Sequence, residues 1–160
     1  MRRNSCCFTG HRSIPTDQYQ RIFDLTEIVV ENFINKGYRY FCTGGALGFD
    51  TLSALVILKL KERYSFIQLI LVLPCLNQTK LWKEKDLLTY EYIKQKADKI
   101  IYTSEMYTYG CMHKRNRHLV NNSSLCICYL KENTGGTFYT VNYAKKQNLS
   151  IVNIANCSIT

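Results

Sequence analysis

The chain lacks the features that mark membrane and secreted proteins. Its longest apolar stretches, such as residues 67–74, are too short to cross a bilayer. The opening Met-Arg-Arg-Asn leads at once into strand-like residues, without the apolar core and cleavage site of a secretory signal. We therefore expect a cytoplasmic protein with no membrane partner.

A cysteine pattern typical of a metal site or a disulfide scaffold is also missing. The sequence has 8 cysteines but no C-x-x-C pair, and its histidines show no zinc-type spacing with them. In a cytosolic chain disulfides are uncommon. Five of the cysteines lie inside apolar, strand-like runs, where a thiol behaves as a small hydrophobe: Cys6, Cys7, Cys42, Cys126 and Cys128. We expect neither a metal nor a cofactor.

What the chain does have is apolar residues and positive charge. Hydrophobic residues make up 46% of its 160 residues, enough for one domain, residues 1–160, with a proper core. The net charge is +9, but basic residues are scattered except in residues 113–118. That segment is either a solvated helix face or an anion site. We favour a small anion as the partner, with nucleic acid as the less favoured alternative.

Strand-like and helix-like segments alternate along the whole chain. Strands are predicted at residues 5–8, 38–42, 67–73, 99–102, 125–130 and 149–154. Helices are predicted at residues 17–36, 48–63, 85–96, 112–120 and 138–147, with Leu88, Tyr92 and Ile93 facing inward in the third, and the tail 155–160 is expected to be disordered. Repeated β-α units predict an α/β fold, a Rossmann-like three-layer α/β/α arrangement with a mostly parallel sheet of about six strands.

Glycine-rich turns follow several of these strands and should meet at the carboxyl edge of the sheet, where such folds bind ligands. Glycine permits tight turns and close approach of a ligand to the backbone, and a following helix directs N–H groups at an anion. The candidate ligand-binding residues are Thr9, Gly10, His11, Arg12, Thr43, Gly44, Gly45, Gly48, Asp50, Trp82, Arg115, Asn116, Gly135, Gly136 and Thr137.

These motifs, in this order, resemble a known family. The runs Cys-Cys-Phe-Thr-Gly-His-Arg and Thr-Gly-Gly-Ala-Leu-Gly-Phe-Asp are followed by Val-Leu-Pro-Cys with Gln78 and Trp82, by Gly-Cys before Arg115-Asn116, and by Gly-Gly-Thr. Over residues 5–155 this is similar to the YpsA-like branch of the SLOG superfamily. The resemblance implies a Rossmann-like sheet with a pocket for a nucleotide or nucleotide derivative, and a homo-oligomer.

One element of the related LOG phosphoribohydrolases is absent. Their Pro-Gly-Gly-x-Gly-Thr-x-x-Glu run ends in a glutamate that assists glycosidic cleavage, whereas residues 134–142 read Thr-Gly-Gly-Thr-Phe-Tyr-Thr-Val-Asn. We therefore expect a protein that senses or sequesters a nucleotide-type signal, of the cyclic or ADP-ribose kind. The alternatives are a nucleotide N-glycosidase that uses Asp50 and Arg115, and single-stranded DNA binding like that of the DprA branch.

Several of the candidate residues also have purely structural interpretations. Arg12 could grip a phosphate or pair with Asp17 on the surface. Asp50 could accept from ribose hydroxyls or cap its own helix. Trp82 could stack on a base or fix its loop to the core, and the sequence leaves each pair of alternatives open.

Overall fold

The structure, a computed structural model, describes residues 2–158 and is built on one six-stranded sheet. All five strand pairings are parallel, and the strand order is β4-β3-β2-β1-β5-β6. The strands are β1 (Ser5–Gly10), β2 (Tyr40–Thr43), β3 (Gln68–Leu73), β4 (Lys99–Tyr102), β5 (Leu125–Tyr129) and β6 (Ser150–Asn153). The predicted Rossmann-like fold is therefore confirmed.

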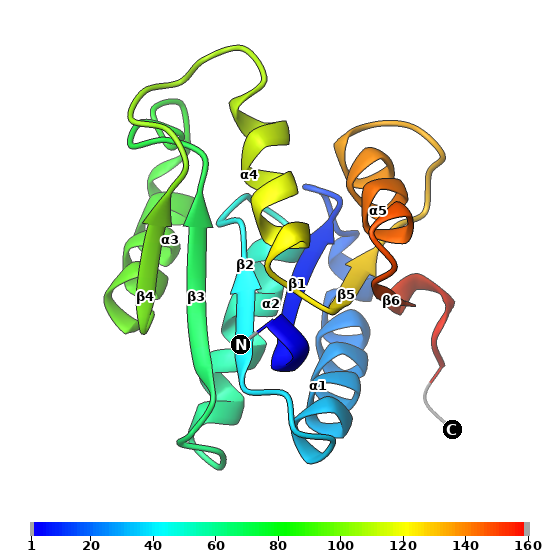
Figure 1. Ribbon diagram of the computed structural model, residues 1–160. Helices are drawn as coiled ribbons and strands as arrows, with labels where there is room; N and C mark the ends of the chain where they lie inside the picture. Colours follow the sequence, from blue (N-terminus) through cyan, green and yellow to red (C-terminus); the bar gives the residue numbers. More distant parts are fainter. Residues whose placement is uncertain (1, 159–160) are drawn as a thin grey trace.

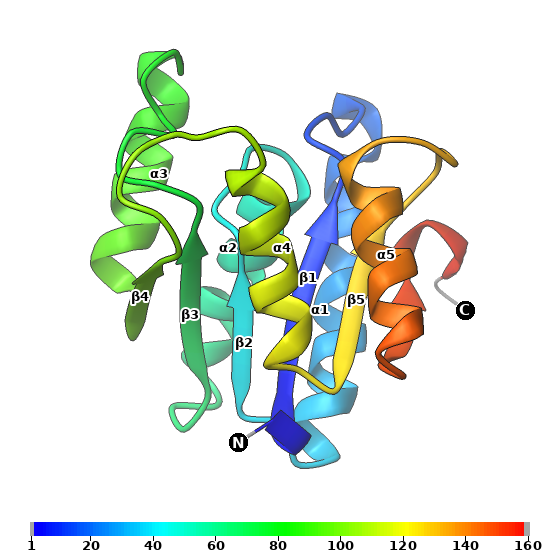
Figure 2. The same ribbon diagram turned by 45° about the horizontal axis from the view of Figure 1, so that its top comes forward.

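Helices cover both faces of the sheet, as Figures 1 and 2 show. One face carries α1 (Tyr19–Asn35), α2 (Phe49–Lys61) and α3 (Glu84–Lys96), and the other carries α4 (Cys111–Asn121) and α5 (Gly136–Lys146). Short 3-10 turns lie at Arg2–Asn4, Thr16–Gln18 and Ile154–Asn156. Consecutive parallel strands need such crossovers, which is why strand and helix alternate in the sequence.

The core is split by the sheet into two clusters because the central strands are buried on both faces. Phe8 and Phe41 belong to the cluster under α1, α2 and α3, whereas Cys7, Cys126 and Cys128 belong to the cluster under α4 and α5. All of these cysteines are free. Burial raises the pKa of the Cys128 thiol to about 12, so it stays protonated and packs as an apolar side chain.

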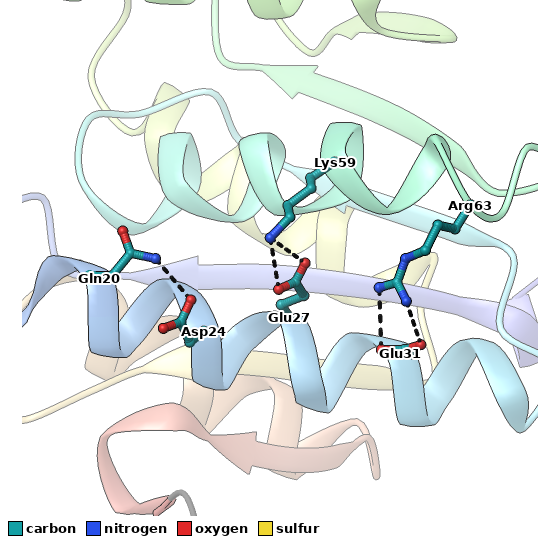
Figure 3. A network of polar contacts seen from close by, with 6 residues as sticks. All are labelled: Gln20, Asp24, Glu27, Glu31, Lys59 and Arg63. Atoms are coloured by element: carbon teal, nitrogen blue, oxygen red, sulfur yellow. Dashed lines mark hydrogen bonds and ion pairs between the residues drawn. The ribbon is translucent and has the colours of Figure 1, made fainter.

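Polar contacts on the outer side tie α1 to α2 (Figure 3). Lys59 reaches Glu27 at 3.0 Å, and Arg63, just past the end of α2, reaches Glu31 at 3.3 Å. Such exposed ion pairs each contribute about 0–1 kcal/mol. The helices are therefore held together mainly by their apolar faces, with Ile22, Val30 and Ile34 of α1 among the buried residues.

The first predicted helix begins later than the sequence suggested. Residues 16–18 form a 3-10 turn in which Gln18 N–H donates to the Pro15 carbonyl at 2.9 Å, and α1 starts at Tyr19. Proline fixes its own φ, and Pro15 has an extended ψ of 132°. The chain therefore needs one tighter turn before it enters the helix.

Two further expectations are corrected. Leu88 and Tyr92 are 66% and 49% exposed, and α3 instead buries Tyr90 together with the predicted Ile93. Residues 155–160 were expected to be disordered, but residues 155 and 156 belong to the 3-10 turn Ile154–Asn156, in which Ala155 N–H donates to Asn153 Oδ1 at 3.1 Å. Residues 159–160 of that predicted tail lie outside the described residues.

The sheet order reverses between β1 and β5, which opens a crevice there. The chain builds β2, β3 and β4 on one side of β1 and then returns to add β5 and β6 on the other. After β1 the chain passes to one face, through α1, and after β5 to the opposite face, through α5 (Figure 2). Loops that diverge in this way open a crevice above the carboxyl ends of the two strands. Within residues 2–158, no helix has the length and apolar character needed to span a membrane.

Candidate functional site

A cavity of about 320 Å³ lies at this crevice, and we call it the central cavity. Its walls come from the end of β1, from the loop before α2 and its first turn, from α4, from the connection after β5 and from the start of α5. The lining residues are Thr9, Gly10, His11, Arg12, Ala46, Asp50, Met112, Arg115, Asn116, Glu132, Thr134, Gly135, Gly136 and Thr137.

Most of the sequence-predicted residues thus lie together, from four separate segments. The exceptions are Thr43, Gly44, Gly45, Gly48 and Trp82, which do not line the central cavity. Thr43 is buried, and its hydroxyl donates to the carbonyl of Asp50 at 3.2 Å. Three of these five exceptions, Gly44, Gly45 and Gly48, belong to the β2–α2 loop, so most of that loop packs behind the cavity wall and does not line the cavity.

In the β2–α2 loop, glycines make room for protein rather than for a ligand. Gly48 has φ +78°, and a Cβ there would lie 2.4 Å from the backbone carbonyl of Arg12. The next N–H, of Phe49, donates to the carbonyl of His11 at 3.1 Å. Gly45, with φ +71°, has its missing Cβ 2.5 Å from Leu73 Cδ2. The loop after β2 is therefore packed directly onto the end of β1 and onto β3.

Gly44 accommodates the guanidinium of Arg115, which is only 4% exposed. Arg115 Nη1 donates to the Gly44 carbonyl, and Nε donates to Asn116 Oδ1 at 2.7 Å. A Cβ on Gly44 would lie 2.4 Å from Nη1. The cation is thus held rigidly in the cavity wall, with part of its five-donor fork already in use.

Asp50 is the second buried charged group of the wall and is 6% exposed. Its Oδ2 accepts from the N–H of Ala46 at 3.1 Å, which is a contact within its own loop and helix start. Burial raises the pKa of Asp50, while the charge of Arg115 and the hydrogen bond from Ala46 oppose that shift. Burial likewise lowers the pKa of Arg115, and the charge of Asp50 opposes it.

The start of α5 is open by contrast. Gly135 has φ +96°, and a Cβ built on Gly135 or Gly136 would meet nothing within 4 Å. No acceptor in the described part of the chain takes the N–H groups of residues 136–138, and no side chain caps the helix. These free donors and the positive end of the helix dipole border the central cavity, with Thr137 beside them.

Arg12 contributes an exposed cation to the wall of this cavity. Between residues 2 and 158 no ion pair or hydrogen bond engages its guanidinium, and it does not pair with Asp17. Its neighbour His11 is instead fixed, because the N–H of Lys131 donates to His11 Nε2 at 2.8 Å. The ends of β1 and β5 are joined by that bond.

The basic segment 113–118 does not act as one cluster, because α4 distributes its side chains around the helix. Only Arg115 and Asn116 of this segment reach the central cavity. His113 packs on Tyr139 of α5, with ring centres 4.3 Å apart, and Arg117 Nη1 donates to the Tyr139 hydroxyl at 3.3 Å. These two side chains therefore brace α4 against α5.

A larger cavity of about 650 Å³, which we call the aromatic cavity, adjoins the central one. Arg12 and Met112 line both. Trp82 lines the aromatic cavity and also packs edge-on against Tyr90, with ring centres 5.1 Å apart. Both interpretations of Trp82, as a loop anchor and as a wall of a ligand site, are therefore compatible with its position.

Sequence reasoning missed Ala46, Met112, Glu132 and Thr134. Glu132 is the most consequential of them, because it adds a carboxylate to the wall of the central cavity. A signal was available: Glu132 and Thr134 stand between the end of β5 and the predicted Gly135-Gly136 turn. Every residue of that connection has to pass the same edge of the sheet.

The chain is similar in sequence to several known proteins and to one family model. The model of the YspA SLOG family matches residues 6–156. The SPbeta prophage-derived protein YoqJ of Bacillus subtilis, itself described as uncharacterized, is 31% identical over 134 residues, which are 76% of this chain and 78% of YoqJ. The UPF0398 protein BH1768 of Halalkalibacterium halodurans is 31% identical over 117 residues, and these cover 71% of this chain but only 62% of that protein.

Solved structures show the same fold in a larger protein. DNA processing protein A of Helicobacter pylori, described for its single-stranded DNA binding mode, superposes with a TM-score of 0.66 at 18% identity. Its counterpart from Streptococcus pneumoniae gives a TM-score of 0.66 at 14% identity. Each comparison covers 92% of this chain but only 63% and 48%, respectively, of the DprA chains.

Proposed function

The chain belongs to the YspA SLOG family, and from the shape and charge of its central cavity we propose that it binds the phosphate of a nucleotide or nucleotide derivative there. The observation that carries this proposal is the open start of α5 at Gly135 and Gly136, opposite the cations Arg12 and Arg115. Free N–H groups, a helix dipole and two guanidinium groups around one cavity favour a compact anion with several acceptor oxygens.

The components of this site have different tasks. Arg115, tied to Gly44 and Asn116, supplies fixed positive charge and little motion. Arg12, exposed and without a partner in residues 2–158, has its planar fork free for two phosphate oxygens. The α5 N–H groups complete the cradle. The central and aromatic cavities are each of a size that is usual for small-molecule sites, roughly 300–1,000 Å³.

Titration calorimetry with matched ligands tests this assignment. We expect AMP to bind at least about tenfold more tightly than adenosine, because only AMP carries the phosphate. Arg12→Met should remove most of that difference. Arg21→Met, which deletes an exposed arginine that does not line the central cavity, is the matched control and should bind like the wild type. Equal binding of AMP and adenosine, or an Arg12→Met variant with unchanged affinity, would contradict the proposal.

A ligand held without turnover would make the protein a sensor or a sequestering protein, and this is the role we propose. A sensor built on this chain would pass its signal on through self-association or a partner, so addition of the ligand should change the mass measured by light scattering. An unchanged mass with tight binding would favour sequestration.

Glu132 is the observation that favours a second candidate, cleavage of the N-glycosidic bond. A carboxylate at the cavity wall could stabilise an oxocarbenium-like transition state or activate water, as this chemistry requires. Release of free base from AMP that disappears in Glu132→Gln, while AMP still binds, would establish this activity. Recovery of intact AMP after long incubation would exclude it for that nucleotide.

Similarity to DNA processing protein A and the net charge of +9 favour a third candidate, single-stranded DNA binding. Phosphate contacts by several cations would give an affinity that falls steeply with salt. An oligonucleotide gel shift at low salt that is lost as salt is raised would support this function. No shift at low salt would remove it.

A further inference from the structure

The aromatic cavity contains one feature that nothing assigned so far uses, the carboxamide of Gln78. Its Nε2 donates to the hydroxyl of Tyr90 at 3.1 Å, which holds that end of the carboxamide against Tyr90. Its Oε1 is buried and has no hydrogen-bond partner in the described part of the chain. Buried acceptors without a donor are rare and costly, so an acceptor of this kind beside a cavity indicates a donor supplied by a ligand.

The surroundings of Gln78 suit a flat, partly apolar group. Trp82 and Tyr107 line the same cavity, and the exposed Leu81, 93% accessible, lies at its wall. Aromatic and apolar walls with few fixed polar atoms are the usual environment for a planar heterocycle.

The loops that form this wall are joined to each other. Asn77 Oδ1 accepts from the N–H of Tyr107 at 3.0 Å, and Leu76 N–H donates to the Glu105 carbonyl at 3.0 Å. The segment that holds Gln78 and Trp82 is therefore fixed to the one that holds Tyr107. The cavity is thus framed by two loops that are hydrogen-bonded to each other, and Gln78 is held by Tyr90. Such a frame can hold the edge of a ligand in one orientation.

The two cavities share part of their walls. Arg12 and Met112 line both cavities, so the aromatic cavity continues from the place proposed for the phosphate. We propose that the aromatic cavity holds the base of the same nucleotide and that Gln78 Oε1 accepts a hydrogen bond from an amino group on that base. This inference rests on the proposed phosphate site and adds the ligand class, a nucleotide with an amino-bearing base.

Replacement of the amino group by a carbonyl provides a direct test, because it changes the exocyclic donor into an acceptor. The adjacent ring nitrogen changes at the same time from an acceptor into an N–H donor, so the whole hydrogen-bonding edge of the base is inverted. Adenine against hypoxanthine, and cytosine against uracil, are such pairs. A carbonyl facing Gln78 Oε1 would leave two acceptors opposed and the protein acceptor unpaired. The wild-type chain should therefore bind AMP more tightly than IMP, and CMP more tightly than UMP, each by about tenfold or more.

A variant then assigns this preference to Gln78. In Gln78→Leu the AMP to IMP ratio and the CMP to UMP ratio should both fall to near one, with phosphate-dependent binding retained. Gln95→Leu, which changes an exposed glutamine of α3 outside both cavities, should keep the wild-type ratios. Because the ligand comparison on the wild type needs no variant, equal binding within each nucleotide pair overturns the proposal even where Gln78→Leu folds poorly.

The possible outcomes distinguish failure of the base-reading role of Gln78 from failure of the proposed phosphate site. If the four nucleotides bind equally well, or if the amino preference persists in Gln78→Leu, the base-reading role is overturned and the phosphate site stands. If none of the four binds, both proposals fail together. Tighter binding of IMP and UMP would also overturn the assignment, since it would mean that the protein presents a donor at this position.

Discussion

Two glycine-rich connections of this molecule look alike in sequence and do opposite things. The β2–α2 connection, with Gly44, Gly45 and Gly48, is filled by protein: the guanidinium of Arg115, the side chain of Leu73 and the backbone of Arg12 occupy the spaces where Cβ atoms would be. The β5–α5 connection, with Gly135 and Gly136, has nothing within 4 Å of either missing Cβ. Glycine in the first loop permits packing, and in the second it leaves space.

The two helix starts differ in charge in the same way. The first turn of α2 contains Asp50, which accepts from the N–H of Ala46, whereas the first turn of α5 has no acidic residue. The carboxylate of Asp50 offsets the positive end of the α2 dipole, and the first N–H of α2, of Phe49, already donates to the carbonyl of His11. The start of α5 is therefore better suited to an external anion than the start of α2, and the proposed phosphate site is based on this difference.

The largest expected effect comes from adding a methyl group to the filled loop. Gly48→Ala places a Cβ 2.4 Å from the Arg12 carbonyl at a φ of +78°, where both the conformation and the contact are unfavourable. We expect the free energy of unfolding, measured in urea, to fall by at least about 2 kcal/mol. A variant as stable as the wild type would show that the β2–α2 loop can move away from β1, which would end the distinction between the two loops.

Removal of the buried Arg115 guanidinium, which links α4 to the β2–α2 connection, should have the next largest effect on stability. Arg115→Met leaves the Gly44 carbonyl and Asn116 Oδ1 without their donor, so we expect a loss of about 1–3 kcal/mol in the same assay. Arg12→Met is the matched comparison and should leave stability within about 0.5 kcal/mol, because Arg12 is exposed. Equal losses in both variants would show that Arg115 has no special structural role.

The fold was predictable because its signal is spread over many residues. Apolar runs such as residues 67–73 mark strands buried on both faces, and the regular alternation with helices is typical of a parallel sheet. The predictions failed where one or two residues decide. On α3, Tyr90 rather than Tyr92 faces inward, because the buried side of a helix depends on the element it packs against. The start of α1 is delayed to Tyr19 by the 3-10 turn that follows Pro15.

For the site, the sequence predicted which segments meet at one edge of the sheet, but it did not predict which of their residues face the cavity and which pack against protein. Gly10, Arg12 and Thr137 were placed in the cavity by topology alone. Gly45 and Gly48 follow their strand in the same manner, yet they are covered by Leu73 and by the backbone of Arg12. Glycine carries no side chain to reveal its environment, so only the structure separates a filled turn from an open one.

A smaller effect, visible only as a change with pH, should come from Asp50. Burial raises its pKa above the ordinary value of 3.8, so the folded state binds this proton more tightly than the unfolded state. Its contribution to stability is therefore full below that ordinary value and is lost as pH rises through the raised pKa. Measured from about pH 3 to about pH 7, the wild type should lose stability relative to Asp50→Asn. A relative gain would mean that the charge of Arg115 outweighs burial.

The smallest effect on stability, and the sharpest test of the comparison, is to give α5 what α2 already has. Gly136→Asp places a carboxylate in the open first turn of α5, where we expect it to stabilise the fold by about 0.3–1 kcal/mol through the helix dipole. The same carboxylate should occupy the proposed phosphate site and abolish AMP binding. Gly136→Asn has nearly the same shape without the charge, so it should bind AMP far better than Gly136→Asp. If the two variants bind AMP alike, charge at the start of α5 does not select the ligand, and the phosphate of the nucleotide must lie elsewhere.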